Sequence, residues 1–155
     1  MGLPQETFAM DSNLPFPAPS KQAAGEINGT KTDVSSISFS DKIMITVTQN
    51  GRLAQWVTVP LLSDNPTTGD PFFQTAQSEE DALMPSTRFV PRTLLGAGGP
   101  EREMTGHLFA AQIAHAITTK TPGETRSLML GLGLAKAETD REVFLQLVDL
   151  VLNVI

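Results

Sequence analysis

The segment FSDKIMITVTQNGRLAQWVTVP (39–60) contains two alternating apolar runs joined by Asn50 and Gly51. Both residues tolerate the positive φ angles of a type I′ turn, so the pair predicts a tight β-hairpin. Successive side chains of a strand point to opposite faces, and one face of this hairpin is strongly apolar: Ile43, Ile45, Val47, Leu53, Gln55, Val57 and Val59. The other face is half apolar: Met44, Thr46, Thr48, Ala54, Trp56 and Thr58. Since neither face is properly polar, the hairpin needs cover on both sides.

The composition limits the class of protein. A chain of 155 residues fits one ordinary domain with tails and a loop. The net charge of −6 argues against a nucleic-acid partner, which requires a broad basic surface. The absence of cysteine excludes disulfides, thiolate catalysis and Cys-ligated metals. The N-terminus does not resemble a secretory signal and the longest nearly apolar stretch, 143–155, is too short to span a bilayer, so we expect no membrane partner.

Three segments differ in composition. Residues 1–20 are rich in proline and small polar residues, and we expect a disordered tail. Residues 21–155 form the expected single domain. Within it, 61–87 is a long insert with three prolines and five acidic residues but no Lys or Arg. This insert is either a solvated loop or an acidic arm that becomes ordered on a basic partner, and Phe72 and Phe73 support the second interpretation.

Further strands follow from local patterns. Asn28 and Gly29 predict a second hairpin turn, between strands at 20–27 and 32–39, so that the first three or four strands form an antiparallel meander. A strand at 88–95 is interrupted by a proline, which predicts an edge position or a bulge. Alternating leucines predict the clearest strand, at 127–134.

Two helices are expected. The first begins at Pro100, ends before Pro122 and is amphipathic. The second follows Thr139, which forms a capping box with Glu142. Strands and helices in this order predict an α+β domain, with about six antiparallel strands and both helices on one face of the sheet.

No catalytic pattern emerges. The glycine-rich segment 96–99 precedes a helix, as phosphate-binding loops do, but it lacks the spacing and the lysine of a Walker loop, and Glu101 and Glu103 would repel a phosphate. His107 and His115 are eight positions apart on the helix, too far apart to share a metal. We therefore expect no catalytic, cofactor-binding or metal-binding residues, no cofactor and no enzyme activity.

Because the two helices cover only one face of the sheet, the other face is expected to be flat and moderately apolar. Its residues are Met44, Thr46, Thr48, Ala54, Trp56, Met129, Gly131 and Gly133. Such a surface marks a binding site, and its glycines allow another backbone to approach. The acidic insert or the N-terminal tail could fold over it. We favour the sheet of a second chain, which gives a helix, sheet, sheet, helix sandwich.

Four segments carry a resemblance to a known family: VSSISFSDKIMITVTQNGRLAQWVTV (34–59), RTLLGAGGPE (92–101), HLFAAQIAHAI (107–117) and SLMLGLGLAKAETDREVFLQLVDLV (127–151). Together they resemble the proteasome assembly chaperone 3 family. The resemblance covers most of 25–155 and implies a six-stranded antiparallel sheet with two helices that dimerises through the sheet. It also implies a cytoplasmic chaperone, with the nucleus left open as a second location.

As the resemblance implies it, this chaperone pairs with proteasome assembly chaperone 4, binds 20S proteasome α subunits, promotes assembly of the α-ring and then dissociates. A homodimer is left open for conditions in which the partner is absent. The N-terminal extension and the acidic insert exceed the shorter family members, so no α-subunit contact is transferred from the family. We hypothesise instead that the insert contributes to this contact, through Phe72, Phe73, Glu79, Glu80, Asp81, Arg88 and Arg92. Two other functions stay open, a dimerisation scaffold with an unrelated client and a small ligand-binding or hydrolytic α+β domain.

Overall fold

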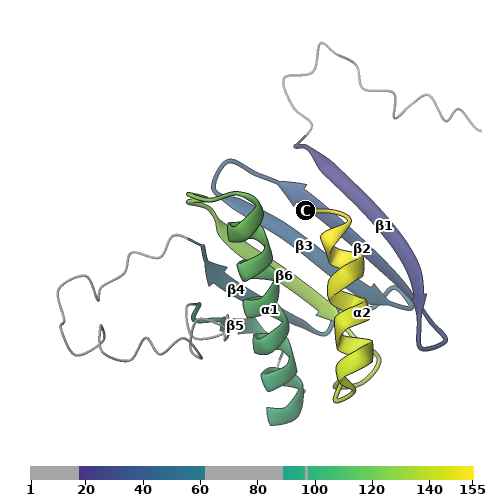
Figure 1. The fold of residues 1–155 in the computed structure, drawn as a ribbon. Helices are drawn as coiled ribbons and strands as arrows, with labels where there is room; N and C mark the ends of the chain where they lie inside the picture. Colours follow the sequence, from purple (N-terminus) through teal and green to yellow (C-terminus); the bar gives the residue numbers. More distant parts are fainter. Residues whose placement is uncertain (1–17, 62–88, 97) are drawn as a thin grey trace, which may run out of the picture.

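The computed structural model describes residues 18–61, 89–96 and 98–155. The predicted tail and the predicted insert lie almost entirely outside these residues. Along the chain the elements are β1 (Ser20–Ile27), β2 (Thr30–Ser38), β3 (Lys42–Gln49), β4 (Gln55–Pro60), β5 (Arg92–Leu95), α1 (Pro100–Lys120), β6 (Ser127–Gly133) and α2 (Arg141–Leu152). Figure 1 shows the strands in one sheet, with both helices side by side on one of its faces.

The sheet contains six strands in the order β1-β2-β3-β6-β4-β5. Neighbouring strands are antiparallel except β3 and β6, which are parallel. The predicted α+β class is therefore confirmed, with a mostly antiparallel sheet.

The hairpin predicted for 39–60 is only partly correct. Asn50 and Gly51 form the turn, with φ angles of 55° and 70°, and the Arg52 N–H donates to the Gln49 carbonyl over 3.3 Å. After this one bridge the two arms separate, and β6 lies between β3 and β4. The prediction that the two arms pair with each other, which would extend the meander to β4, was therefore wrong. The physical reason is that β6 is apolar or glycine at every position after Ser127, and such a strand is most stable in the centre of a sheet.

The second turn and the edge position of the strand predicted at 88–95 are confirmed, but that strand begins only at Arg92, so Pro91 precedes it and does not interrupt it. Asn28 and Gly29 form the predicted second turn, with φ angles of 50° and 75°, and join the antiparallel strands β1 and β2. The short strand β5 lies at the sheet edge, and its register with β4 shifts between Trp56 and Val57, as a bulge does. β5 begins directly after Pro91 because proline has no N–H to donate to a neighbouring strand.

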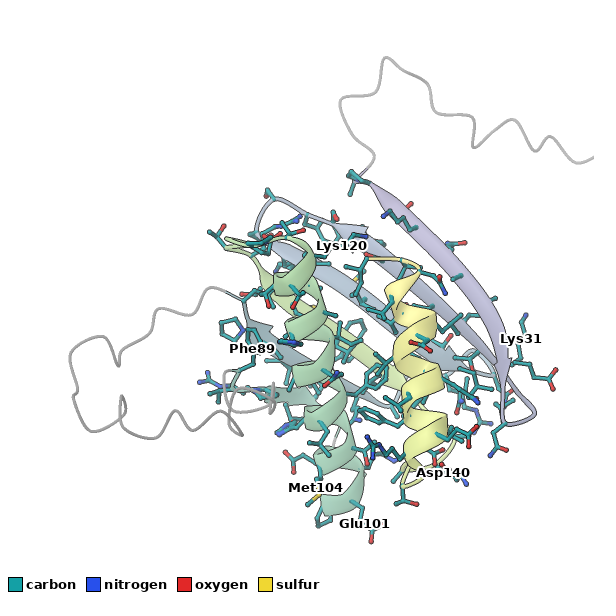
Figure 2. All side chains as sticks on the ribbon, viewed as in Figure 1. Lys31, Phe89, Glu101, Met104, Lys120 and Asp140 are labelled. Carbon is teal, nitrogen blue, oxygen red and sulfur yellow. The ribbon has the colours of Figure 1, made fainter. Side chains whose placement is uncertain are left out.

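The core lies between the sheet and the helices (Figure 2). Leu128, Leu130 and Leu132 of β6 are completely buried in it, as their alternation predicts. The Phe109 ring of α1 meets the Phe144 ring of α2 edge to face, with centroids 5.5 Å apart. This geometry suits aromatic pairs and fixes the two helices against each other.

The first turn of α2 differs from the prediction by one residue. The N-cap is Asp140, whose carboxylate accepts from the Glu142 N–H over 2.8 Å, and the Glu138 carboxylate accepts from the Asp140 N–H over 2.9 Å. The predicted Thr139–Glu142 capping box was therefore wrong. An aspartate caps as well as a threonine and adds a negative charge at the positive end of the helix, which explains the preference for Asp140.

A bidentate ion pair closes the connection between α1 and β6. Arg126 Nε and Nη2 each lie 2.8 Å from a Glu124 carboxylate oxygen, and Arg126 Nη1 donates to the Phe39 carbonyl over 3.1 Å. These hydrogen bonds hold the pKa of Glu124 at about 2, below its ordinary value of 4.5. The connection is thereby tied to the turn between β2 and β3.

We predict that this ion pair makes stability depend on acid pH. Because folding lowers the pKa of Glu124, the stabilisation is complete above pH 4.5 and is lost as the pH falls toward 2. The stabilisation is at most about 3 kcal/mol, and water around the partly exposed Arg126 reduces it by screening the charges. Glu124→Gln should lower the free energy of unfolding at neutral pH and flatten its decline in acid, measured by urea denaturation. Glu26→Gln, at an exposed position of β1, is the control, and an unchanged pH profile in Glu124→Gln would contradict the prediction.

Candidate interaction face of the sheet

The sheet face opposite the helices is built from rows of residues that strand pairing places side by side. One row across β3, β6 and β4 contains Met44, Met129 and Thr58. The next row contains Thr46, Gly131 and Trp56. In the third row Thr48 pairs with Gly133. Ala54 lies at the same end of the sheet, where its N–H donates to the Leu132 carbonyl over 2.8 Å. We call these nine residues the outer face. The structure thus brings all eight residues predicted for this face together in one block.

The outer face is partly open in the isolated chain. Met44, Trp56 and Met129 are half-buried, whereas Ile45 and Leu130, which point to the helices, are fully buried. No described helix or strand covers these side chains. A contiguous surface that contains two methionines and a tryptophan has the composition of a protein interface core.

Two glycines on the outer face are required for packing within the chain. A Cβ at Gly131 would lie 2.9 Å from the Trp56 ring, so the indole lies over this glycine. A Cβ at Gly133 would lie 1.4 Å from the Arg52 carbonyl oxygen, because the backbone of Arg52 and Leu53 crosses the end of β6. The glycines were expected to allow the backbone of another chain to approach, but at Gly133 the approaching backbone belongs to the same chain. This crossing carries the polypeptide from the turn at Asn50 to β4 on the far side of β6.

Three apolar neighbours of the outer face were missed from the sequence. Ile37 lies opposite Met44 in register, and Leu95 lies opposite Trp56. Leu53 was predicted to share a face with Val57, and this was wrong: it precedes β4, approaches Gly131 and is 46% exposed. The alternation of each strand predicts which way its side chains point, but the strand order is needed to know that these residues are neighbours. They widen the apolar surface toward β2 and β5.

Hydroxyl groups border the apolar part of the outer face. Ser35 Oγ and Thr46 Oγ1 are 2.6 Å apart, and Thr48 Oγ1 donates to the Asp33 carbonyl over 3.4 Å. Because these hydroxyls already have partners, covering them with another surface leaves them satisfied. An apolar centre with a satisfied polar border is the usual arrangement of a protein–protein interface.

Only one residue of the predicted client contact is described. Arg92 is exposed on β5 and lies opposite Thr58, so it extends the first row of the outer face to the sheet edge. Phe72, Phe73, Glu79, Glu80, Asp81 and Arg88 lie outside the described residues. The contact itself stays a prediction.

His107 and Gly96, which were considered for chemistry from the sequence, occupy structural positions. His107 Nε2 lies 2.8 Å from Thr93 Oγ1, which also donates to Glu103 Oε1 over 3.1 Å. A Cβ at Gly96 would lie 2.0 Å from the Ala54 carbonyl oxygen, so this glycine allows close packing against the strand end. Across the described ranges, no group of three or more His, Cys, Asp or Glu side chains is placed to hold a metal. No helix in the described part of the chain is long and apolar enough to cross a membrane.

The geometry defines a small α+β domain whose sheet has one face covered by helices and one that no described helix or strand covers. No protein-family model and no curated protein matches the chain. A solved structure does: a chain in the crystal structure of a novel chaperone complex for yeast 20S proteasome assembly, with a TM-score of 0.55 and 14% sequence identity. The match covers 87% of this chain and 97% of that chain. At this identity the similarity establishes a shared fold.

Proposed function

We propose that this protein is a subunit of a proteasome assembly chaperone, which acts by binding other proteins and not as an enzyme. The observation that carries the proposal is the outer face, a partly exposed and largely apolar block that no described helix or strand covers, on a fold shared with a chain of a yeast 20S proteasome assembly chaperone complex. The outer face binds the sheet of a second chain. The four sequence segments that resemble the proteasome assembly chaperone 3 family support the same function independently.

In its finer form, the proposal follows the sequence resemblance. The partner is proteasome assembly chaperone 4, the clients are 20S proteasome α subunits during assembly of the α-ring, and the chaperone then dissociates in the cytoplasm. A partner with the same fold suits the outer face, because two sheets pack about 10 Å apart through interdigitating side chains. Met44 and Met129 lie side by side in its first row, and flexible methionines adapt to a partner that is not identical.

The experiment that tests the proposal is mass spectrometry of the proteins that co-purify with the tagged chain from its own cells after mild cross-linking. We expect a second chain of similar size together with 20S α subunits and no mature β subunits. A second chain without α subunits would support pairing and reject the role in assembly. Recovery of neither would contradict the whole proposal.

A further inference from the structure

Exposed apolar side chains also gather at the edge of the molecule that contains β5, and one of them, Leu95, adjoins the outer face. In the described part of the chain nine large apolar residues are exposed, and five of them lie on α1, on β5 or just before β5. These five are Val90, Leu94, Leu95, Met104 and Leu108. Met104 and Leu108 are 65% and 51% exposed. A cluster of exposed apolar side chains of this kind marks an interaction site.

Part of this edge forms an open groove of about 490 Å³ along α1. We call it the α1 groove, and its walls are Pro91, Pro100, Glu103, Met104, His107, Leu108 and Ala111. Met104 projects from the flank of α1 that is turned away from α2, and Phe89 lies on that same side (Figure 2). Because α1 covers the opposite face of the sheet from the outer face (Figure 1), a partner in this groove does not compete with one bound there.

The spacing in the groove matches a helix and not a strand. Met104, Leu108 and Ala111 are separated by four and then three positions, the repeat by which one helix packs along another. Addition of a strand to the neighbouring edge is opposed by the short strand β5, by Pro91 before it and by the register shift within it. Side-chain packing against a helix is therefore the available mode of binding.

The charge at the groove is negative. Thr93 Oγ1 donates to Glu103 Oε1 over 3.1 Å and contacts His107 Nε2 over 2.8 Å, which fixes the Glu103 carboxylate on the groove wall. Glu101 is exposed on the same first turn of α1. None of the described residues that line the groove is a Lys or Arg. A partner with a basic side chain beside its apolar stripe complements this arrangement.

We propose that the α1 groove is a second protein-docking site, which takes an amphipathic helix of another protein that has Lys or Arg beside its apolar stripe. Only the identity of that protein rests on the proposed function. If the proposed function is correct, the protein in the groove is the client subunit, which is bound there while the outer face binds the partner chain. Binding buries Met104 and Leu108 and places the basic side chain near Glu103. The chain would thus engage two proteins on two separate surfaces.

The first test uses the full chain and a synthetic Leu/Lys peptide with a helical apolar stripe. We expect binding by calorimetry, and Leu108→Asp or Met104→Asp should weaken it about 30-fold. The matched control is Leu145→Asp, because Leu145 is a comparably exposed leucine on α2, at 46%. A Leu/Glu peptide with the same stripe should bind much more weakly. Equal loss in Leu145→Asp, or equal binding of both peptides, would overturn the proposal.

The second test uses purified 20S α subunits and separates this inference from the proposed function. If an α subunit binds the wild type and Leu145→Asp but not Leu108→Asp, both stand. If an α subunit binds Leu108→Asp as tightly as the wild type, the groove proposal is overturned and the chaperone function remains. If no α subunit binds the wild type while the peptide result holds, the groove stands and the client assignment falls.

Discussion

Met44→Asp is expected to abolish pairing with the second chain while the monomer stays folded. Met44 is half-buried in the first row of the outer face, where it lies between Ile37 and Met129 in register. In the monomer an aspartate at this position can still reach water. In a sheet-to-sheet interface its charge would be buried without a partner, which costs several kcal/mol and raises Kd by at least about 100-fold.

Analytical ultracentrifugation of the two co-expressed chains measures this effect, with circular dichroism as the test of folding. Leu145→Asp is the control, since it places the same charge on α2. Gly131→Arg is a poorer variant because any side chain at 131 meets the Trp56 ring at 2.9 Å. A folded Met44→Asp chain that still pairs would move the interface elsewhere, and loss of the fold would mean that this face is internal core.

Gly133→Ala is expected to destabilise the fold severely. The new Cβ would lie 1.4 Å from the Arg52 carbonyl oxygen and 2.3 Å from its carbon. These are backbone atoms of the crossing segment, which cannot move aside as a flexible side chain does. The loss should reach about 3 kcal/mol or more, the upper range for overpacking, because the crossing must shift away from β6.

Urea denaturation measures this loss, and Gly25→Ala is the matched control. Gly25 is also in a strand, but its Cβ would meet only Leu150 methyl groups, at 3.5 and 3.7 Å. These are ordinary contact distances, so we expect a change of no more than about 1 kcal/mol. If Gly133→Ala is as stable as Gly25→Ala, the backbone of Arg52 does not cross β6 as described.

Local patterns predicted the strands, helices and turns well but not the strand order. The Asn50–Gly51 turn formed as expected, yet its two arms do not pair because a strand about 80 residues later occupies the space between them. The unbroken apolar run of β6 was the available signal for a central strand. Turn residues report local geometry, whereas the choice of neighbour depends on which strand most needs burial on both sides.

The candidate face was predictable because alternation is a strictly local property. Met44 and Trp56 point away from the helices for the same reason that Ile45 and Val57 point toward them. The α1 groove was not predicted, since it forms where Pro91, far from Met104 and Leu108 in the pattern of the helix, lies beside α1. Sequence patterns thus predicted the sheet surface, and tertiary packing was required to reveal the groove.

Two separate surfaces suit a protein that assembles others. On the proposed function, the outer face holds the partner chain and the α1 groove holds the client, so that each contact can form or break without the other. The central claim is that a second chain of the same fold packs on the outer face.

The most direct test places a photo-reactive amino acid at Thr46, in the middle row of the outer face, and activates it in the protein's own cells. The account predicts a cross-link to a second chain of similar size from position 46 and none from the same group at Leu145. A cross-linked partner from position 145 but not from position 46 would contradict it.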